Sequence, residues 1–245
     1  MDATQPIFLN ADVGEGAPCD AELIPHVGGV NISCGAHAGD VADQQQAIDH
    51  ALVHGCRLGA HPSYPDRDNF GRKVISMSLS DLVGSLHEQL TALDTILAAR
   101  GAQMDYIKPH GALYNQMAHD AEFATQILTA LRVWRPLPVM VLAQSQAQQA
   151  AHALGVPYVR EGFLDRCYMD DGQLVPRSAP HSVHSDVKVA QRQAHAFFSG
   201  RPITTESGAS LSIEVDSLCV HGDTPQAVAF LQAVLPVTPV QPARH

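Results

Sequence analysis

Residues 106 to 115 read Tyr106-Ile107-Lys108-Pro109-His110-Gly111-Ala112-Leu113-Tyr114-Asn115, and in this stretch an apolar segment runs into ionisable side chains. Proline cannot donate to a sheet ladder, so a strand that begins near Asp105 is expected to end at Pro109. Side chains alternate between the two faces of an extended segment, so Lys108 and His110 are predicted to point the same way. The pair marks either the edge of a functional site or a lysine that reaches solvent beside a satisfied histidine.

Strands alternate with helices on both sides of this stretch. Segments rich in branched apolar residues predict seven strands, at 7–13, 30–34, 56–62, 105–110, 139–143, 158–165 and 217–223. Helical spacing predicts helices at 41–54, 80–100, 121–133, 144–154, 187–198 and 225–234. The clearest is 80–100, where leucines recur at helical spacing behind a Ser80 N-cap. This order predicts parallel strands joined by helical crossovers, in an open sheet or a closed barrel.

Polar residues at the strand ends favour the barrel. Ligands of an open sheet gather at one switch point, whereas the carboxyl ends of all barrel strands converge on one mouth. Six of the seven predicted strands end in polar side chains, and capped loops explain one such end more easily than six. We therefore predict an α/β fold, a (β/α) barrel. Its mouth would contain Asn10, Asp12, Asn31, His37, His61, Lys108, His110, Glu161, Asp165, Arg166, His221 and Asp223.

Three loops are expected to extend this mouth. Glu15 stands between two glycines, in a turn that can bring backbone amides close to a ligand. Residues 59–72 are too rich in proline and glycine for a helix and carry Arg72. Residues 168–185 form the longest stretch without a clear pattern, and they carry Arg177. Long ordered loops are often lids, so we interpret this last segment as one.

The composition limits the classes of function. With 45% hydrophobic and 16% charged residues, the chain suits one globular domain over residues 1–245, with a proline-rich tail at 236–245. A formal net charge of −10 argues against nonspecific binding to nucleic acid or to an anionic membrane. No apolar run approaches the ~20 residues of a membrane span, and residues 1–6 lack the basic start of a signal peptide, so we expect a cytoplasmic protein. Five scattered cysteines without a Cys-x-x-Cys pair indicate neither a disulfide framework nor a zinc knuckle.

Three kinds of chemistry are open to such a mouth. General acid–base hydrolysis would use its carboxylates and imidazoles. Metal-assisted hydrolysis would use an aspartate and two histidines from different strands, although no His-Glu-x-x-His is present. Nucleophilic catalysis is disfavoured because the chain has no Gly-x-Ser-x-Gly elbow. Neither common phosphate-binding loop is present, so a nucleotide must be held differently or elsewhere. Four cations would suit a carboxylate or phosphate on the substrate: Arg72, Lys108, Arg166 and Arg177.

Five longer motifs stand in order along the chain. They are Leu9-Asn10-Ala11-Asp12-Val13-Gly14-Glu15, Asn31-Ile32-Ser33-Cys34-Gly35-Ala36-His37-Ala38-Gly39-Asp40, Gly59-Ala60-His61-Pro62-Ser63-Tyr64-Pro65-Asp66, Lys108-Pro109-His110-Gly111-Ala112-Leu113-Tyr114-Asn115 and Cys219-Val220-His221-Gly222-Asp223-Thr224-Pro225. Together they resemble the LamB/YcsF family, the A subunit of the prokaryotic ATP-dependent 5-oxoprolinase. The resemblance implies a seven-stranded (β/α) barrel related to the polysaccharide deacetylase group. It also implies an enzyme that opens 5-oxoproline to glutamate with ATP and works with two further subunits, of B and C type.

The implied reaction gives the mouth residues their expected roles. ATP would phosphorylate the lactam oxygen, after which a carboxylate or imidazole activates water and cations hold the developing charge. We favour Asp12 as the base because it lies on a strand end, with His61, His110 or His221 as the acid. The expected catalytic residues are Asp12, His61, Lys108, His110, Asp165, His221 and Asp223. The expected substrate contacts are Asn10, Glu15, Asn31, His37, Arg72, Arg166 and Arg177.

Two other functions stay open. A stand-alone, metal-dependent amide or acetyl hydrolase of the same barrel class would be sensitive to chelators and independent of ATP. A non-enzymatic scaffold subunit would leave the activity of its complex unchanged when the mouth is mutated. The sequence names neither a metal nor the subunit that holds ATP.

Overall fold

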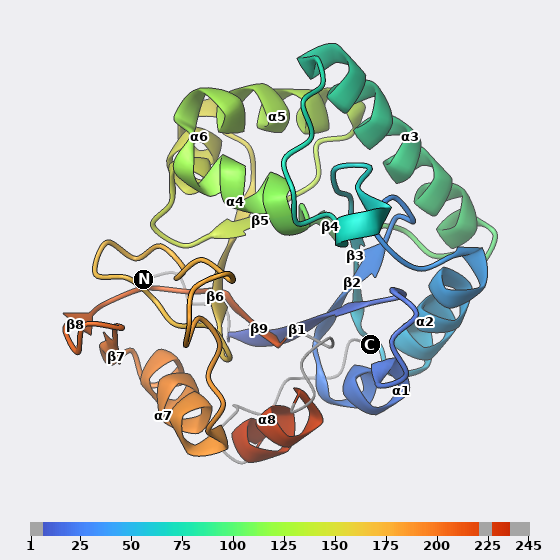
Figure 1. Ribbon diagram of the computed structural model, residues 1–245. Coiled ribbons are helices and arrows are strands. Elements are labelled where there is room, and N and C mark those ends of the chain that lie inside the picture. The colour runs from blue at the N-terminus through green and yellow to red at the C-terminus, as the bar shows by residue number, and fades with distance from the viewer. Residues whose placement is uncertain (1–6, 221–226, 236–245) are drawn as a thin grey trace.

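The computed structural model of the protein describes residues 7–220 and 227–235 and contains a closed barrel of parallel strands (Figure 1). β1 pairs with β2 on one side and with β9 on the other, which closes the barrel. The predicted seven-stranded (β/α) barrel is confirmed. Its strands, in order around the barrel, are β1 (Phe8–Val13), β2 (Gly29–Ser33), β3 (Arg57–His61), β4 (Tyr106–Ile107), β5 (Val139–Leu142), β6 (Tyr158–Phe163) and β9 (Ser217–Val220).

Helices surround the barrel (Figure 1). They bury apolar stripes against the strands, as in α3, where five leucines at helical spacing are at most 2% exposed. None of the described helices is long and apolar enough to cross a membrane. The longer helices are α2 (Val41–Val53), α3 (Leu79–Ala98), α4 (Gly111–His119), α5 (Ala121–Trp134), α6 (Gln146–Leu154), α7 (Val187–Phe198) and α8 (Ala227–Val234). The short ones are α1 (Asp20–Leu23), η1 (Ile24–His26) and η2 (Arg67–Asn69).

Two features differ from the sequence-based predictions, the start of one helix and the presence of a small hairpin. α3 begins at Leu79 after a Ser78 cap, whose hydroxyl accepts from the Asp81 amide, so the predicted Ser80 cap was wrong. A small hairpin of β7 (Ile203–Thr204) and β8 (Ser210–Leu211) was not predicted, because its strands are too short to show alternation. The predicted ends of the seventh strand at 221–223, the start of the last helix and the tail at 236–245 lie outside the described residues.

The stretch around Pro109 is shorter as a strand than predicted and leads into an unpredicted helix. β4 contains only two residues, yet the amides of Lys108 and His110 still donate to carbonyls of the β3 segment, each at 2.8 Å. Gly111 then opens α4 with a φ of 55°, and a Cβ there would lie 2.4 Å from the Gly71 carbonyl oxygen. The helix was missed because it has only nine residues, begins at a glycine and includes Asn115, Gln116 and His119, so its apolar pattern is short.

The interior of the barrel is apolar at the amino ends of the strands and polar toward the carboxyl ends. Phe8, Tyr106 and Met140 pack together in one small buried cluster. A Cβ on Gly59 would lie 2.3 Å from the Tyr106 ring, so glycine is needed for this ring to fill the barrel. Two residues beyond Phe8 and Tyr106 stand Asn10 and Lys108, on the same face of each strand. Polar side chains therefore lie directly above an apolar layer inside the barrel.

Candidate active site

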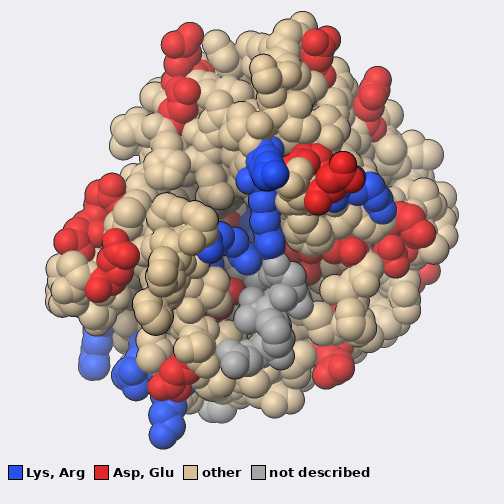
Figure 2. All heavy atoms as spheres, in the orientation of Figure 1, with Lys and Arg blue, Asp and Glu red and all other residues tan. Residues whose placement is uncertain are grey.

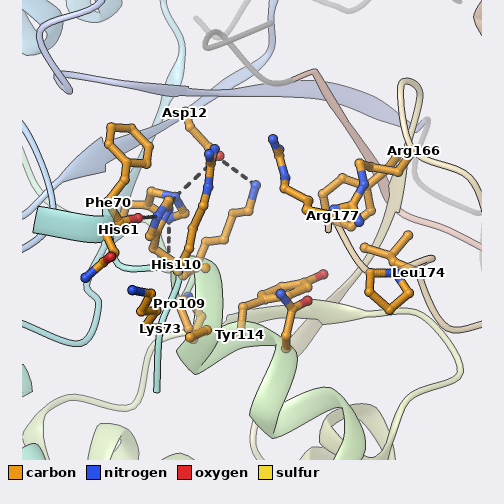
Figure 3. A pocket seen from close by; sticks show the side chains of 18 of the residues that line it. Asp12, His61, Phe70, Lys73, Pro109, His110, Tyr114, Arg166, Leu174 and Arg177 are labelled. Atoms are coloured by element: carbon orange, nitrogen blue, oxygen red, sulfur yellow. Dashed lines mark hydrogen bonds and ion pairs between the residues drawn. The ribbon is translucent and has the colours of Figure 1, made fainter. Parts of the chain in front are cut away.

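A cavity of about 580 Å³ lies at the carboxyl ends of the strands (Figure 3). Its floor is formed by the carboxyl ends of β1 and β3 and by the residues that follow β4. One wall is formed by the long loop that follows β6. That loop is the predicted lid segment, so it does border the predicted mouth. The polar residues lining the cavity are Asp12, Glu15, His61, Asn69, Arg72, Lys73, Lys108, His110, Tyr114, Asn115, His119, Arg166, Arg177 and Ser178.

Asp12, Lys108 and Glu161 form a buried ionic group, which we call the lysine cluster. Lys108 Nζ lies 2.9 Å from Asp12 Oδ1 and 2.8 Å from Glu161 Oε1. Beneath it, Asn31 Nδ2 donates to both Asp12 Oδ1 and Asn10 Oδ1. Burial lowers the pKa of Lys108, but the Asp12 and Glu161 carboxylates outweigh burial and hold the pKa well above its ordinary value. Lys108 is therefore a fixed cation at the cavity floor.

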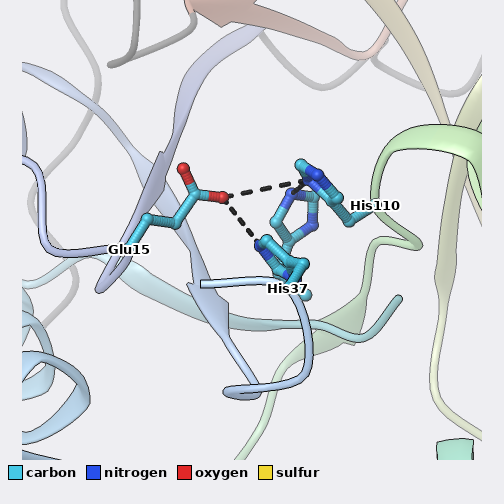
Figure 4. A group of neighbouring side chains, drawn as sticks. Glu15, His37 and His110 are labelled. Carbon is cyan, nitrogen blue, oxygen red and sulfur yellow. Dashed lines mark hydrogen bonds and ion pairs between the residues drawn. The ribbon is translucent and has the colours of Figure 1, made fainter. Parts of the chain in front are cut away.

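Beside it lie Glu15, His37, His61 and His110, which we call the histidine cluster (Figure 4). The rings of His37 and His110 stack with centroids 3.8 Å apart, and the His61 ring stands edge-on to both. Glu15 Oε1 lies 2.9 Å from His37 Nε2 and 3.8 Å from His110 Nδ1. One ligand atom from each of the four side chains falls within 4.8 Å of the others.

Two imidazoles of this cluster, those of His37 and His110, are held neutral. Burial, followed by the neighbouring His61 ring, lowers the pKa of His37 to about 3. Burial, followed by the His37 and His61 rings, holds the pKa of His110 well below its ordinary value. Low-dielectric surroundings disfavour a charged ring, and a second charged ring beside it even more. At neutral pH His37 and His110 therefore offer lone pairs rather than charge.

Cations line the opposite wall. Arg166 is 4% exposed, and its guanidinium donates to the carbonyl oxygens of Val175 and Ser182 at 2.6 and 3.3 Å. Burial, followed by repulsion from Arg177, lowers the pKa of Arg166 to about 10, so it is still charged at neutral pH. Figure 2 shows lysine and arginine side chains gathered around the central hollow of this face. The cavity thus has fixed cations on one wall and the acceptor atoms of the histidine cluster on the other.

Residues 7–239 match the sequence model of the LamB/YcsF family. The chain belongs to this family. The 5-oxoprolinase A subunit of Neisseria meningitidis serogroup C (strain 053442) is 40% identical over 230 residues, covering 93% of this chain and 94% of the relative. The protein of the same name from Corynebacterium glutamicum is 39% identical over 235 residues, covering 94% and 93%.

Two solved structures resemble this chain. The lactam utilization protein from Thermus thermophilus superposes with a TM-score of 0.86 at 34% identity, covering 94% of this chain and 95% of that one. A structure from Enterococcus faecalis V583 superposes with a TM-score of 0.57 at 12% identity, covering 96% and 91%. At that identity the second likeness shows the fold alone.

The structure brings eight of the predicted site residues of this LamB/YcsF chain to the wall of one cavity: Asp12, Glu15, His61, Arg72, Lys108, His110, Arg166 and Arg177. Asn10 and Asn31 are fully buried below it, where they hold Asp12 and Lys108. His37 stands behind Glu15 in the histidine cluster. Asp165 is fully buried and does not line the cavity; its carbonyl accepts from the His184 amide. His221 and Asp223 lie outside the described residues.

Two residues gain a role at the site that the sequence did not assign. Glu161 was expected at the mouth but given no role, and it completes the lysine cluster. Tyr114 lines the cavity from α4, and burial, followed by the nearby Glu161 carboxylate, raises its pKa well above the ordinary value, which keeps the hydroxyl protonated. Tyr114 lies four residues after His110, the spacing that places two side chains on one helix face, and this signal could have found it.

Proposed function

We propose that this LamB/YcsF chain is the A subunit of an ATP-dependent 5-oxoprolinase, a cytoplasmic hydrolase that opens the lactam ring of 5-oxoproline to L-glutamate at the expense of ATP. Two further subunits, of B and C type, would complete the enzyme, and one of them could hold the ATP. Relatives of nearly equal length at about 40% identity bear the name of this subunit, which supports the proposal.

The observation that carries the proposal is the placing of fixed cations opposite a carboxylate in one cavity. 5-Oxoproline combines a carboxylate with a lactam, and the arginines would hold the carboxylate while the lactam faces Asp12 and Lys108. The volume of about 580 Å³ lies in the range of small-molecule sites.

The reaction needs activation because a lactam carbonyl is a poor electrophile. Transfer of the terminal phosphoryl group of ATP to the lactam oxygen releases ADP and makes the ring carbon more electrophilic. Asp12 takes a proton from water as its oxygen adds to that carbon, and Lys108 opposes the negative charge that develops there. The ring C–N bond then breaks as the nitrogen receives a proton, from one of the imidazoles predicted as the acid. A second water hydrolyses the acyl phosphate to L-glutamate and phosphate.

Assays of the purified chain, with and without B- and C-type subunits, would test this function. We expect ATP-dependent release of glutamate from 5-oxoproline by the assembled subunits and none by the chain alone. Asp12→Asn in the assembled enzyme should lower kcat by about 10² to 10⁴ fold, whereas Asp68→Asn at an exposed position should leave kcat unchanged. Turnover by the single chain, or turnover without ATP, would refute the proposal.

The histidine cluster favours a second candidate, a stand-alone metal-dependent hydrolase of amides or acetyl groups. Three imidazoles and a carboxylate are ligands that suit zinc and similar ions. This candidate predicts hydrolysis by the single chain that needs no ATP and stops when a chelator is added. The same assay, run with N-acetylated and simple amide substrates, separates the two functions.

A further inference from the structure

Hydrogen bonds on the far sides of His61 and His110 determine which nitrogen of each ring carries hydrogen. His61 Nδ1 lies 2.7 Å from the Lys108 carbonyl oxygen, and His110 Nε2 lies 2.8 Å from the Phe70 carbonyl oxygen. A carbonyl oxygen only accepts, so both of these nitrogens must be the protonated ones. In the neutral rings His61 Nε2 and His110 Nδ1 therefore carry lone pairs. These two atoms face each other at 2.9 Å.

The same reasoning applies to His37, through Ser63. The Ser63 hydroxyl donates its single hydrogen to the Tyr64 carbonyl oxygen at 2.8 Å. With that hydrogen used, Ser63 Oγ can accept from His37 Nδ1, which lies 3.0 Å away. In this tautomer the lone pair of a neutral His37 is on Nε2, which faces Glu15 Oε1 at 2.9 Å. A carboxylate oxygen is also an acceptor.

In these tautomers acceptors converge from four side chains, and the facing lone pairs of His61 and His110 have no hydrogen between them. Facing lone pairs repel, so this arrangement needs a positive charge at its centre, either a proton or a metal ion. A single proton can lie between only one pair of these atoms. A divalent ion satisfies all the lone pairs at once, and far-side carbonyl acceptors are the usual partners of metal-bound histidines.

The distances also fit an ion. Donors about 2.0–2.1 Å from a central ion lie about 3.4 Å apart in a tetrahedron. The closest pairs of donor atoms here are separated by 2.9, 2.9 and 3.8 Å. Asp12 Oδ2 stands 3.4 Å from His61 Nε2, as a neighbouring oxygen on the cavity side.

We propose that Glu15, His37, His61 and His110 bind one divalent transition-metal ion, with Zn²⁺ as the reference ion, at the wall of the cavity. Imidazole with carboxylate is a ligand set typical of such ions. The inference goes beyond the proposed lactam opening and does not depend on it, because it concerns binding alone. An ion here would occupy the lone pairs of His61 and His110, so neither ring could also serve as the acid.

Metal binding by the full chain would test this inference directly. The protein is stripped with a chelator and titrated with Co²⁺, with metal content measured by mass spectrometry and coordination by visible absorption. We expect about one ion per chain and a ligand-field band that Zn²⁺ displaces. His61→Gln and His110→Gln should each weaken Co²⁺ binding by at least about 10² fold. His87→Gln is the matched control, since His87 also donates to a carbonyl but lies on α3 outside the cluster.

Ser63→Ala provides a variant that keeps every ligand. Without the hydroxyl, His37 loses the acceptor that sets its tautomer, so Co²⁺ affinity should fall by about 10 to 100 fold while circular dichroism stays unchanged. Folded wild-type protein that binds no Co²⁺ or Zn²⁺ would overturn the proposal. So would an imidazolium shared by His61 and His110 in the ¹⁵N NMR spectrum of protein incubated with Zn²⁺, or equal Co²⁺ affinity in the wild type and His61→Gln.

Discussion

The lysine cluster and the histidine cluster lie side by side in one cavity, yet their polar atoms are balanced differently. In the lysine cluster a cation stands between the carboxylates of Asp12 and Glu161, so donors face acceptors. In the histidine cluster the lone pairs of His61 and His110 face each other. A buried group that is neutralised within the chain can belong to the fold itself, whereas a group left with converging lone pairs requires something from outside. The comparison separates a cluster that is neutralised within the chain from one that the proposed ion would complete.

The largest expected effect comes from breaking the lysine cluster. Lys108→Met would leave Asp12 and Glu161 buried without their cation, and should lower the free energy of unfolding by about 3–5 kcal/mol. Urea denaturation followed by circular dichroism measures this change. Lys188→Met, at an exposed position of α7, is the control and should change the free energy by less than about 0.5 kcal/mol. A loss below about 1 kcal/mol in Lys108→Met would show that the cluster is not structural.

The histidine cluster should respond to an added ion instead. An ion that binds only the folded chain, supplied at about 100 times its dissociation constant, should raise the free energy of unfolding by about 2.7 kcal/mol. Thermal melts of the wild type and of Lys108→Met should both show this gain, because the ion does not contact Lys108. His61→Gln should show none. An equal gain in the free energy of unfolding of His61→Gln would show that the ion binds outside the histidine cluster.

The cationic wall should affect the substrate carboxylate rather than the fold. In the assembled enzyme, Arg177→Met should lower kcat/KM for 5-oxoproline by about 10 to 100 fold, as expected for a lost hydrogen bond to a charged group. It should have little effect on 2-pyrrolidinone, which has the lactam without the carboxylate. Steady-state kinetics with both substrates measures the difference. Equal losses for the two would mean that Arg177 does not contact the carboxylate.

The smallest effect concerns Asp20, a carboxylate outside both clusters. Burial raises its pKa to about 6, although the Gly14 amide donates to it at 2.7 Å and opposes that rise. A folded-state pKa above the ordinary 3.8 means that the protonated acid favours the fold, and this stability is lost as the pH rises through about 6. Asp20→Asn should therefore raise the Tm by about 2–4 °C at pH 8 and change it little at pH 4. Asp68→Asn, exposed, should show no such dependence on pH.

Much of the barrel follows from local pattern, and the exceptions have local causes. Alternating strand and helix signals and the polar strand ends are sufficient to predict a closed parallel barrel, because each signal depends on residues within one element. α4 was missed because its nine residues begin at a glycine and show too short an apolar pattern. The roles of Asn10 and Asn31 as supports below the cavity were not predicted either, since a polar residue at a strand end looks the same in sequence whether it faces the cavity or lies beneath it.

From the sequence alone one can predict the barrel, the family and most of the side chains that gather at the mouth. Which of these side chains neutralise one another depends on the closed barrel. His61 faces His110 across 49 residues of chain, Glu15 faces His37 across 22, and Lys108 reaches Asp12 across 96. Local patterns report the face on which a side chain lies. They cannot report which lone pair meets which hydrogen, because that depends on contacts between strands distant in sequence and brought together only when the barrel closes.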